Sequence, residues 1–400
     1  MFRVFNIFKD GFAKLLAFSL ILSTLVGFLS FYELYYIVLG VVFVFMLFHI
    51  RELKMGDRTA LFFLIVCLLS LLFNANIPSY FRAWQRLAIY VGVVFVVGPM
   101  FVSPSISRLR SKFLFYSMDL CVLLSVASFI GYFFDINYMV RNGEVLEIGV
   151  GSFSGFMIHS IYLGLFAGLA AAYMLIRTLS ENNKPNKILL SFFTLCCLGA
   201  CILSSSRNGV MSGLVGCLTA LFSWFREKKS KAISWVFVVV LLGAITFPIW
   251  GELTDFLVEK QVENKEMGGV LYSREKKIEA RITEFKRSPI YGIGFCVIDP
   301  KLDVVNIENG QIEPGSSWLE IASMTGIVGF ALFVTLCLKA LKRAWNIEDK
   351  LKSSVLLALL ASFMAHMIFE GWILAPHSIM VVVFWLVLSS TYDQSELVYK

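Results

Sequence analysis

The sequence is poor in charged residues, and this shortage excludes most soluble classes of protein. Charged residues make up 16% of the 400 residues, whereas hydrophobic residues make up 58% and phenylalanine occurs 38 times. A mean hydropathy of +0.77 is too high for a soluble domain of this length. The composition therefore indicates an integral membrane protein.

Groups for disulfide or metal chemistry are also scarce. Seven of the eight cysteines lie in apolar runs, where cysteine acts as a small apolar residue, and only Cys296 lies in a polar segment. The chain has four histidines, and the polar segments expected outside the membrane contain no Asp-x-Asp pair and no His/Asp cluster. We therefore expect no disulfide framework, no metal site and no other cofactor.

Apolar runs of membrane-spanning length follow one another along the whole chain. They predict an all-α, polytopic fold of about twelve transmembrane helices in one membrane domain, residues 1–400. The first run has no small-residue cleavage site and leads directly into the second, so we expect no cleavable signal. The runs are residues 12–30, 35–50, 59–73, 87–101, 113–134, 155–176, 188–203, 210–225, 233–250, 318–341, 354–369 and 379–391.

Lysine and arginine are distributed unequally between alternate connections. The N-terminus and the basic connections are assigned to the cytoplasm by the positive-inside rule, and an even number of helices returns the C-terminus there. The net charge of +7 therefore reflects topology and gives no argument for nucleic-acid binding. The basic connections contain Arg51/Lys54/Arg58, Arg108/Arg110/Lys112, Arg177/Lys184/Lys187, Arg226/Lys228/Lys229/Lys231 and Lys339/Lys342/Arg343/Lys350/Lys352.

The short connections expected on the outer side carry four cationic residues, and all four are arginine: Arg82, Arg86, Arg141 and Arg207. Arg82 and Arg86 are one helical turn apart, so their side chains are expected to project the same way. Lysine would anchor a helix at the interface equally well, whereas the guanidinium fork matches phosphate oxygens in pairs. The pattern indicates a site for an anionic, lipid-linked substrate, with simple anchoring as the alternative, most strongly for Arg141.

The largest polar segment, residues 251–317, is expected on the same outer side. Its central stretch, 273–287, predicts a helix that ends before Pro289. Arg274, Lys277 and Arg281 lie within about 60° of one another on this helix, beside an apolar stripe. We expect the helix to lie on the membrane or against the bundle with its basic edge aimed at the bilayer surface. A solvated amphipathic helix without function is the alternative.

Several motifs occur in a recognisable order along the second half of the chain. Ser204-Ser-Ser-Arg-Asn-Gly stands at a helix junction, and the polar segment carries Ser273-Arg274 and then Glu284-Phe-Lys-Arg-Ser-Pro-Ile-Tyr-Gly-Ile-Gly. Gly315-Ser-Ser-Trp-Leu-Glu opens the following helix. This order resembles the O-antigen ligase and O-antigen polymerase superfamily of bacterial envelope enzymes, over about residues 156–384.

The resemblance implies a metal-independent membrane glycosyltransferase of the GT-C type. It would act at the periplasmic face of the inner membrane on a glycan carried by undecaprenyl pyrophosphate. The acceptor would be a second lipid-linked glycan for a polymerase, or lipid A core for a ligase. Membrane lipid, and a chain-length regulator or flippase of the same pathway, would be further partners.

The resemblance also implies roles for individual residues. Arg207 and Arg274 match the two arginines that hold the donor pyrophosphate in this superfamily. The ligases carry a His-Asn pair just before the helix that follows the large loop. This chain has Gly315-Ser316 there, and the difference favours a polymerase over a ligase.

The general base is left open by the sequence. His159 and Glu313 are candidate catalytic residues beside Arg207 and Arg274, because both are expected near the outer face, where His377, Glu320 and Glu370 also lie. The residues expected to bind substrate are Arg82, Arg86, Lys277, Arg281, Ser316 and Ser317.

Two rival interpretations belong to other classes. A lipid-linked oligosaccharide flippase would place ionisable residues deep along its helices. Here the helix interiors are nearly free of charge, with Asp119 as the main exception, and no matching pair of broken helices typical of many transporters is present. A scaffold without chemistry would leave the preference for arginine unexplained.

Overall fold

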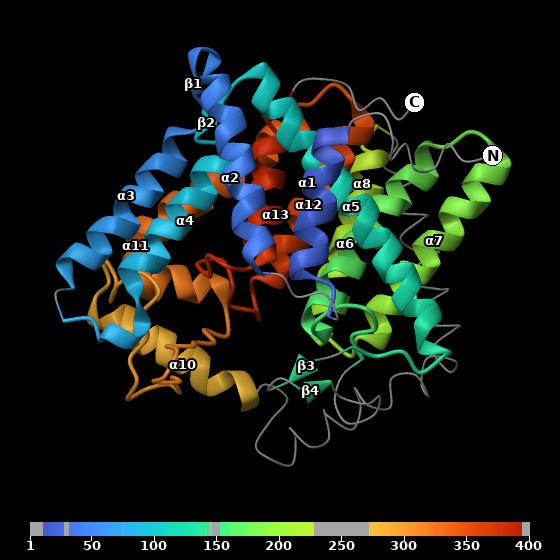
Figure 1. Ribbon diagram of the computed structural model, residues 1–400. Helices are drawn as coiled ribbons and strands as arrows, with labels where there is room; N and C mark the ends of the chain where they lie inside the picture. The colour runs from blue at the N-terminus through green and yellow to red at the C-terminus, as the bar shows by residue number, and fades with distance from the viewer. Residues whose placement is uncertain are drawn as a thin grey trace.

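The computed structural model describes residues 11–27, 32–74, 76–138, 140–141, 144–145, 153–227 and 272–393. These residues are mostly helical and include two short two-stranded antiparallel sheets (Figure 1). The helices are α1 (Gly11–Thr24), α2 (Tyr32–Phe48), α3 (Arg58–Phe73), α4 (Ala83–Val97), α5 (Pro104–Tyr132), α6 (Ser160–Ser180), α7 (Lys184–Leu203), α8 (Arg207–Trp224), α10 (Tyr272–Arg287), α11 (Ser317–Trp345), α12 (Lys350–His366) and α13 (Ile379–Ser390). One sheet pairs β1 (Lys54–Met55) with β2 (Phe101–Val102), and the other pairs β3 (Val140–Arg141) with β4 (Glu144–Val145).

Eleven of the expected spans coincide with helices, and the remaining one, 233–250, lies outside the described residues. Among the described helices, five segments are long and apolar enough to cross a membrane. They are Ser79–Val97, Pro104–Tyr132, Ser160–Ser180, Lys184–Leu203 and Ser317–Trp345. Shorter apolar helices accompany them. Together these helices are those of a helical, polytopic type of membrane protein.

The centre of the bundle is a close crossing of α6 and α8, which also pack on α12. A Cβ atom on Gly209 would lie 2.7 Å from the backbone of Gly164, and one on Gly168 would lie 2.8 Å from Gly213. Each helix thus presents two glycines four residues apart, the small-xxx-small spacing that lets helix backbones touch in membranes. Because Gly164 faces Gly209 and Gly168 faces Gly213, α6 and α8 run parallel and begin at the same end of the bundle.

The connections between helices form two groups at opposite ends of the bundle. One end holds β1, β2 and the end of α13 (Figure 1). There Asp57 accepts hydrogen bonds from Arg343 (3.0 Å) and Tyr392 (2.9 Å), and Lys352 forms an ion pair with Asp393 (2.8 Å). The other end is crossed by α10 and is called the α10 end below (Figure 1). Within the described residues, the basic connections expected in the cytoplasm lie at the first end, and the arginine-bearing ones lie at the α10 end (Figure 1).

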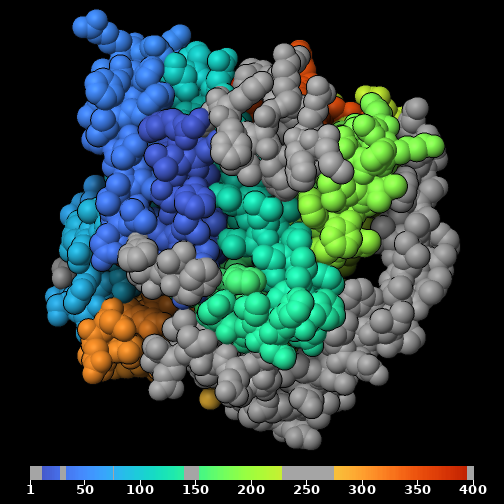
Figure 2. All heavy atoms as spheres, turned by 45° about the vertical axis from the view of Figure 1, so that its right-hand side comes forward, coloured from blue at the N-terminus to red at the C-terminus, as the bar shows by residue number. Residues whose placement is uncertain are grey.

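The outward face of the bundle that includes the chain's first helix shows α1 (dark blue), α5 (teal) and α7 (yellow-green) in turn (Figure 2). Contacts between α1 and α5 and between α5 and α7 agree with this order. Large apolar side chains are exposed on these helices, among them Leu15, Phe18 and Leu195, at 62%, 50% and 65%. Exposed apolar surface of this kind is expected where helices meet lipid.

The segment after α10 is bound into α11 rather than lying free over it. Gly326 interrupts α11 with φ 69° and ψ −173°, and the amide of Ile327 donates to the carbonyl of Pro289 at 2.8 Å. The amide of Ile293 donates to Ser323 at 2.9 Å. A Cβ atom on Gly292 would lie 2.3 Å from the Met324 backbone, so glycine is required for this close approach. The Pro-Ile-Tyr-Gly-Ile-Gly motif, residues 289–294, therefore attaches the C-terminal end of α10 to α11.

The two groups of connections generate a topology prediction. All eight cysteines are buried, so single exposed cysteines can be labelled against a low background. Asn309→Cys, at the α10 end, should react with a membrane-impermeant maleimide in intact cells, and Asn182→Cys, between α6 and α7, should react only after the membrane is opened. Labelling of position 182, but not 309, in intact cells would place the α10 end in the cytoplasm.

Candidate active site

A cleft of about 430 Å³ lies at the α10 end, between the starts of α6 and α13. Its walls include His159 and Tyr162 from the first turn of α6, and His377 just before α13. Glu313 and Glu370 line it from the connections before α11 and after α12. The cleft therefore gathers two histidines and two carboxylates from three separate parts of the chain, because Glu370 and His377 share the connection between α12 and α13.

Two cations of α10 face these carboxylates. Arg274 forms a hydrogen-bonded ion pair with Glu370 and lies 3.9 Å from Glu313, while Lys277 Nζ lies 2.5 Å from Glu313. Burial raises the pKa of the Glu370 carboxyl, and the Arg274 guanidinium opposes that shift. The Glu313 side chain is 63% exposed, whereas that of Glu370 is 10% exposed, so Glu313 is the carboxylate that a ligand in the cleft reaches more easily.

The connection that carries Glu370 is held by two serines at the start of α11. Ser317 Oγ donates to the Glu370 carbonyl at 2.7 Å and accepts from the amide of Trp372 at 3.0 Å. Ser316 Oγ donates to the Met367 carbonyl at 3.3 Å. Both serines are buried. They were expected to bind substrate, and the structure instead bonds their hydroxyls to the backbone that positions Glu370.

The histidines of the cleft have different hydrogen-bond partners. His159 is the N-cap of α6, where its Nδ1 accepts the amide of Ile161 at 3.2 Å, so the neutral ring carries its proton on Nε2. His377 Nδ1 lies 2.7 Å from the Tyr36 hydroxyl. Desolvation lowers the pKa of His377, and Arg86 adds to the shift, which favours the neutral ring. His159 thus suits donation of a hydrogen bond better than removal of a proton.

The orientation of α10 differs from the sequence-based expectation. Arg281 does not face the bilayer surface: its side chain is fully buried and pairs with Glu284 (3.0 Å) and Asp303 (3.2 Å). Ile282 belongs to the apolar stripe predicted beside these cations, yet its side chain is 38% exposed. Burial lowers the pKa of Arg281 and the neighbouring carboxylates oppose that shift. The Arg281 side chain can point inward because Glu284 of α10 and Asp303 of the following loop neutralise its charge.

The arginines of the short connections are placed at the α10 end but are not equivalent. Arg86 donates to the Gly310 carbonyl at 3.0 Å and so binds the large loop to α4. Arg82 is exposed, has a left-handed backbone (φ 47°) and lines a different cleft between α3 and α4. The two side chains therefore have different surroundings, although the turn spacing predicted that they project the same way. Arg141 lies in β3 at the same end (Figure 1).

Arg207 occupies the first position of α8 and is half-buried. The next residue, Asn208, donates to the carbonyl of His366 at 2.7 Å, at the end of α12 and four residues before Glu370. This bond joins the start of α8 to the connection that lines the cleft.

Gly315 is required by the packing of α10. Its φ is +82°, and a Cβ atom there would lie 2.9 Å from the Cβ of Lys277. Any larger residue at this position would be strained and would push Lys277 away from Glu313. The glycine that departs from the ligase pattern is therefore part of the cation–carboxylate arrangement.

From the sequence, Glu370 is only one of several candidate bases, and nothing connects it to Arg274. The one signal is that both are expected on the outer side, since a separation of 96 positions along the chain fixes no distance between them. Among the described residues no group of three His, Cys, Asp or Glu side chains is arranged to hold a metal ion.

Comparison with known proteins gives one family match, which covers part of the chain. A search among curated proteins gives no match. Residues 192–334 match the family Wzy_C, described as O-Antigen ligase. The matched region lies within the expected range 156–384 and contains Arg207, Arg274 and Glu313, whereas His159 and Glu370 lie outside it. The resemblance inferred from the motifs is thus confirmed, and the chain carries a Wzy_C O-antigen ligase region at residues 192–334.

Proposed function

We propose that this protein is a membrane glycosyltransferase that transfers a glycan from a lipid-linked pyrophosphate at the α10 end of the bundle, on the periplasmic side of a bacterial inner membrane. The observation that carries the proposal is the pairing of Arg274 with Glu370 at the wall of the cleft. The pair places a guanidinium beside a cavity whose walls include two histidines and two carboxylates. Members of the Wzy_C family transfer lipid-linked glycans, which agrees with this chemistry.

The reaction breaks the bond between the anomeric carbon of the donor sugar and the pyrophosphate oxygen, and joins that carbon to an acceptor hydroxyl oxygen. The leaving pyrophosphate keeps the electron pair of the broken bond and gains negative charge. Arg274 and Arg207 are the donors proposed to hold it, since guanidinium groups bind phosphate oxygens two at a time. Nε2–H of His159 supplies a further hydrogen bond to the sugar or phosphate.

The acceptor hydroxyl loses a proton, and Glu313 is the residue proposed to take it. Its carboxylate lies at the exposed rim of the cleft, where an acceptor can reach it, and contacts Lys277. Glu370 has a different role. It is mostly buried and bonded to Arg274, so it positions the guanidinium rather than meeting the acceptor.

A polymerase fits the site better than a ligase. The ligase pattern has a histidine–asparagine pair where this chain has Gly315-Ser316. At Gly315 the contact with Lys277 leaves no room for a side chain, and Ser316 is buried and caps α11. The acceptor we propose is therefore a second lipid-linked glycan, with lipid A core as the alternative.

Replacement of the arginines tests the donor site. Arg274→Lys and Arg207→Lys keep the charge but lose the two-pronged geometry, so each should lower the transfer rate on the order of 100-fold. The measurement is glycan transfer by purified protein from a synthetic lipid pyrophosphate donor. EDTA should leave the wild-type rate unchanged.

The matched control is Arg287→Lys on the same helix, an exposed residue paired with Asp299, which should keep the wild-type rate. Normal rates in both lysine variants at positions 207 and 274 would place the donor site elsewhere.

The two carboxylates should respond differently to conservative replacement. Glu313→Gln should lower the rate of transfer about 100-fold or more at saturating donor and remove the lower limb of the pH–rate profile, as expected for a lost base. Glu370→Gln should mainly weaken donor binding, seen as a raised KM, because Arg274 loses its orientation. If Glu370→Gln removes the pH dependence and Glu313→Gln does not, the two roles are reversed.

The choice between polymerase and ligase is tested by the lipid-linked glycans of a deletion strain. Loss of a polymerase should leave glycans of a single repeat unit on the membrane lipid. Full-length chains that accumulate on the pyrophosphate lipid would instead show that the protein is the ligase.

A further inference from the structure

A second cleft at the α10 end lies between the end of α3 and the start of α4. Its volume is about 430 Å³, which lies within the range of small-molecule sites. Among the described residues that line it, none is acidic, whereas two carboxylates line the active-site cleft. The side chains that offer polar or aromatic groups to a ligand are Asn74, Ser79, Arg82, Trp84 and Gln85. The lining therefore carries a net positive charge.

Arg82 supplies the cation of this cleft. It is exposed, and within the described part of the chain its guanidinium has no carboxylate partner. Arg82 is the N-cap of α4, yet its side chain makes no capping hydrogen bond. Its backbone is left-handed, with φ 47° and ψ 41°, a conformation that is strained for a residue other than glycine. Strain of this kind at the wall of a cleft indicates a functional residue.

The other groups of the cleft suit a sugar better than a phosphate alone. Trp84 is 53% exposed, and its indole is a broad apolar surface on which a sugar ring can rest. Ser79 and Gln85 are exposed and can each donate and accept hydrogen bonds. Asn74 Nδ2 donates to the Gly292 carbonyl at 3.1 Å, which leaves Oδ1 as an acceptor. A phosphate group would use only the donors, whereas sugar hydroxyls use donors and acceptors alike.

The α3–α4 cleft is a neighbour of the active-site cleft. Ser79 lines the α3–α4 cleft, and Gln311 lines the active-site cleft. The residues next to them pack tightly, because a Cβ atom on Gly310 would clash with the carbonyl oxygen of Tyr80. With about 3.8 Å between successive Cα atoms, the two linings are on the order of 10 Å apart at this point. A chain of a few sugars is therefore long enough to reach both clefts.

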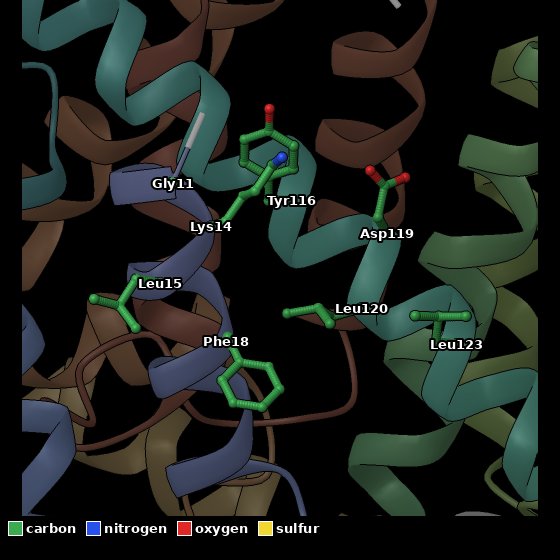
Figure 3. A pocket seen from close by; sticks show the side chains of 8 residues that line it. All are labelled: Gly11, Lys14, Leu15, Phe18, Tyr116, Asp119, Leu120 and Leu123. Atoms are coloured by element: carbon green, nitrogen blue, oxygen red, sulfur yellow. The ribbon is translucent and has the colours of Figure 1, made fainter. Parts of the chain in front are cut away.

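The groove between α1 and α5 has a different lining (Figure 3). Leucine and phenylalanine make up half of its eight lining residues, among them Leu15 and Phe18, which are 62% and 50% exposed. Its acidic residue, Asp119, is paired with Arg177 at 2.9 Å. Apolar walls of this kind are expected against lipid. The polar and aromatic lining of the α3–α4 cleft is thus not a general property of the bundle surface.

We propose that the α3–α4 cleft binds a segment of the glycan substrate that contains an acidic sugar. The sugar carboxylate contacts Arg82, a sugar ring rests on the Trp84 indole, and hydroxyls bond to Ser79 and Gln85. This inference rests on the proposed function and specifies its substrate class, a glycan with carboxylate-bearing sugars. The donor pyrophosphate remains at the active-site cleft, and no bond is made or broken in the α3–α4 cleft.

Binding of a lipid-free oligosaccharide tests the proposal without any transfer step. The purified full-length protein, in phosphatidylcholine nanodiscs, is titrated with tetragalacturonate or with maltotetraose, a neutral chain of the same length, by calorimetry. Tetragalacturonate should bind more tightly. Arg82→Asn removes the guanidinium while asparagine tolerates the left-handed backbone, so it should weaken tetragalacturonate binding on the order of tenfold and leave maltotetraose binding unchanged. Trp84→Ala should weaken both.

The controls separate this site from general surface effects and from the donor site. Lys301→Asn removes an exposed cation of the loop after α10, outside the cleft lining, and Phe18→Ala removes an exposed aromatic ring of the α1–α5 groove, so neither should alter binding. Arg274→Lys should also keep wild-type binding. A protein that binds tetragalacturonate through Arg82 but transfers no glycan would contradict the proposed function and leave this site in place.

Three results would overturn the proposal. The first is equal tetragalacturonate binding by wild type and Arg82→Asn. The second is loss of binding in Arg274→Lys, which would place the oligosaccharide in the active-site cleft. The third is displacement of tetragalacturonate by an equimolar amount of soluble short-chain phosphatidylglycerol, which would make the cleft a site for a lipid headgroup.

Discussion

The arrangement of the active-site end depends on the contact between the backbones of α6 and α8. Gly164 and Gly168 on α6 meet Gly209 and Gly213 on α8 without side chains between them. Because the helices run parallel, this contact brings His159 at the start of α6 and Arg207 at the start of α8 to the same end. A methyl group at any of the four positions would have to separate the helices, and the separation would displace the helix starts that carry His159 and Arg207.

The cations beside the cleft are partly removed from water, and this explains why they are paired with carboxylates. Arg274 and Lys277 are each one-fifth exposed, and both are already paired with carboxylates. Such pairs offset the cost of desolvation, and a phosphate that enters can replace a carboxylate with little reorganisation. The same logic explains the inward turn of Arg281, whose pairing is completed by Glu284 and Asp303 and whose role is to hold α10 in place.

Helix positions could be predicted from the sequence because a long apolar run identifies itself without knowledge of its neighbours. Every expected span within the described residues is a helix. The extent of α10 was also predictable. The side of α10 that packs against the bundle was not. A helical wheel shows that Arg274, Lys277 and Arg281 share an edge, but it contains nothing about Glu370 or Asp303, which pair with these cations from distant parts of the sequence. Likewise, the serines before α11 looked like substrate ligands because their backbone partners, Met367 and Glu370, become neighbours only in the folded chain.

The binding of the Pro289–Gly294 segment into the break of α11 has a mechanical consequence. At Gly326 the helix gives up part of its own hydrogen bonding, and the segment after α10 supplies the replacement through Pro289. The C-terminal end of α10 is therefore a fixed support, and a swinging motion about it would expose unpaired amides within α11. Under the proposed function, adjustment to glycans of different size would come from side-chain rotation of Arg274 and Lys277. The reach of these two side chains, rather than a moving lid, would then limit how far the donor phosphate shifts during transfer.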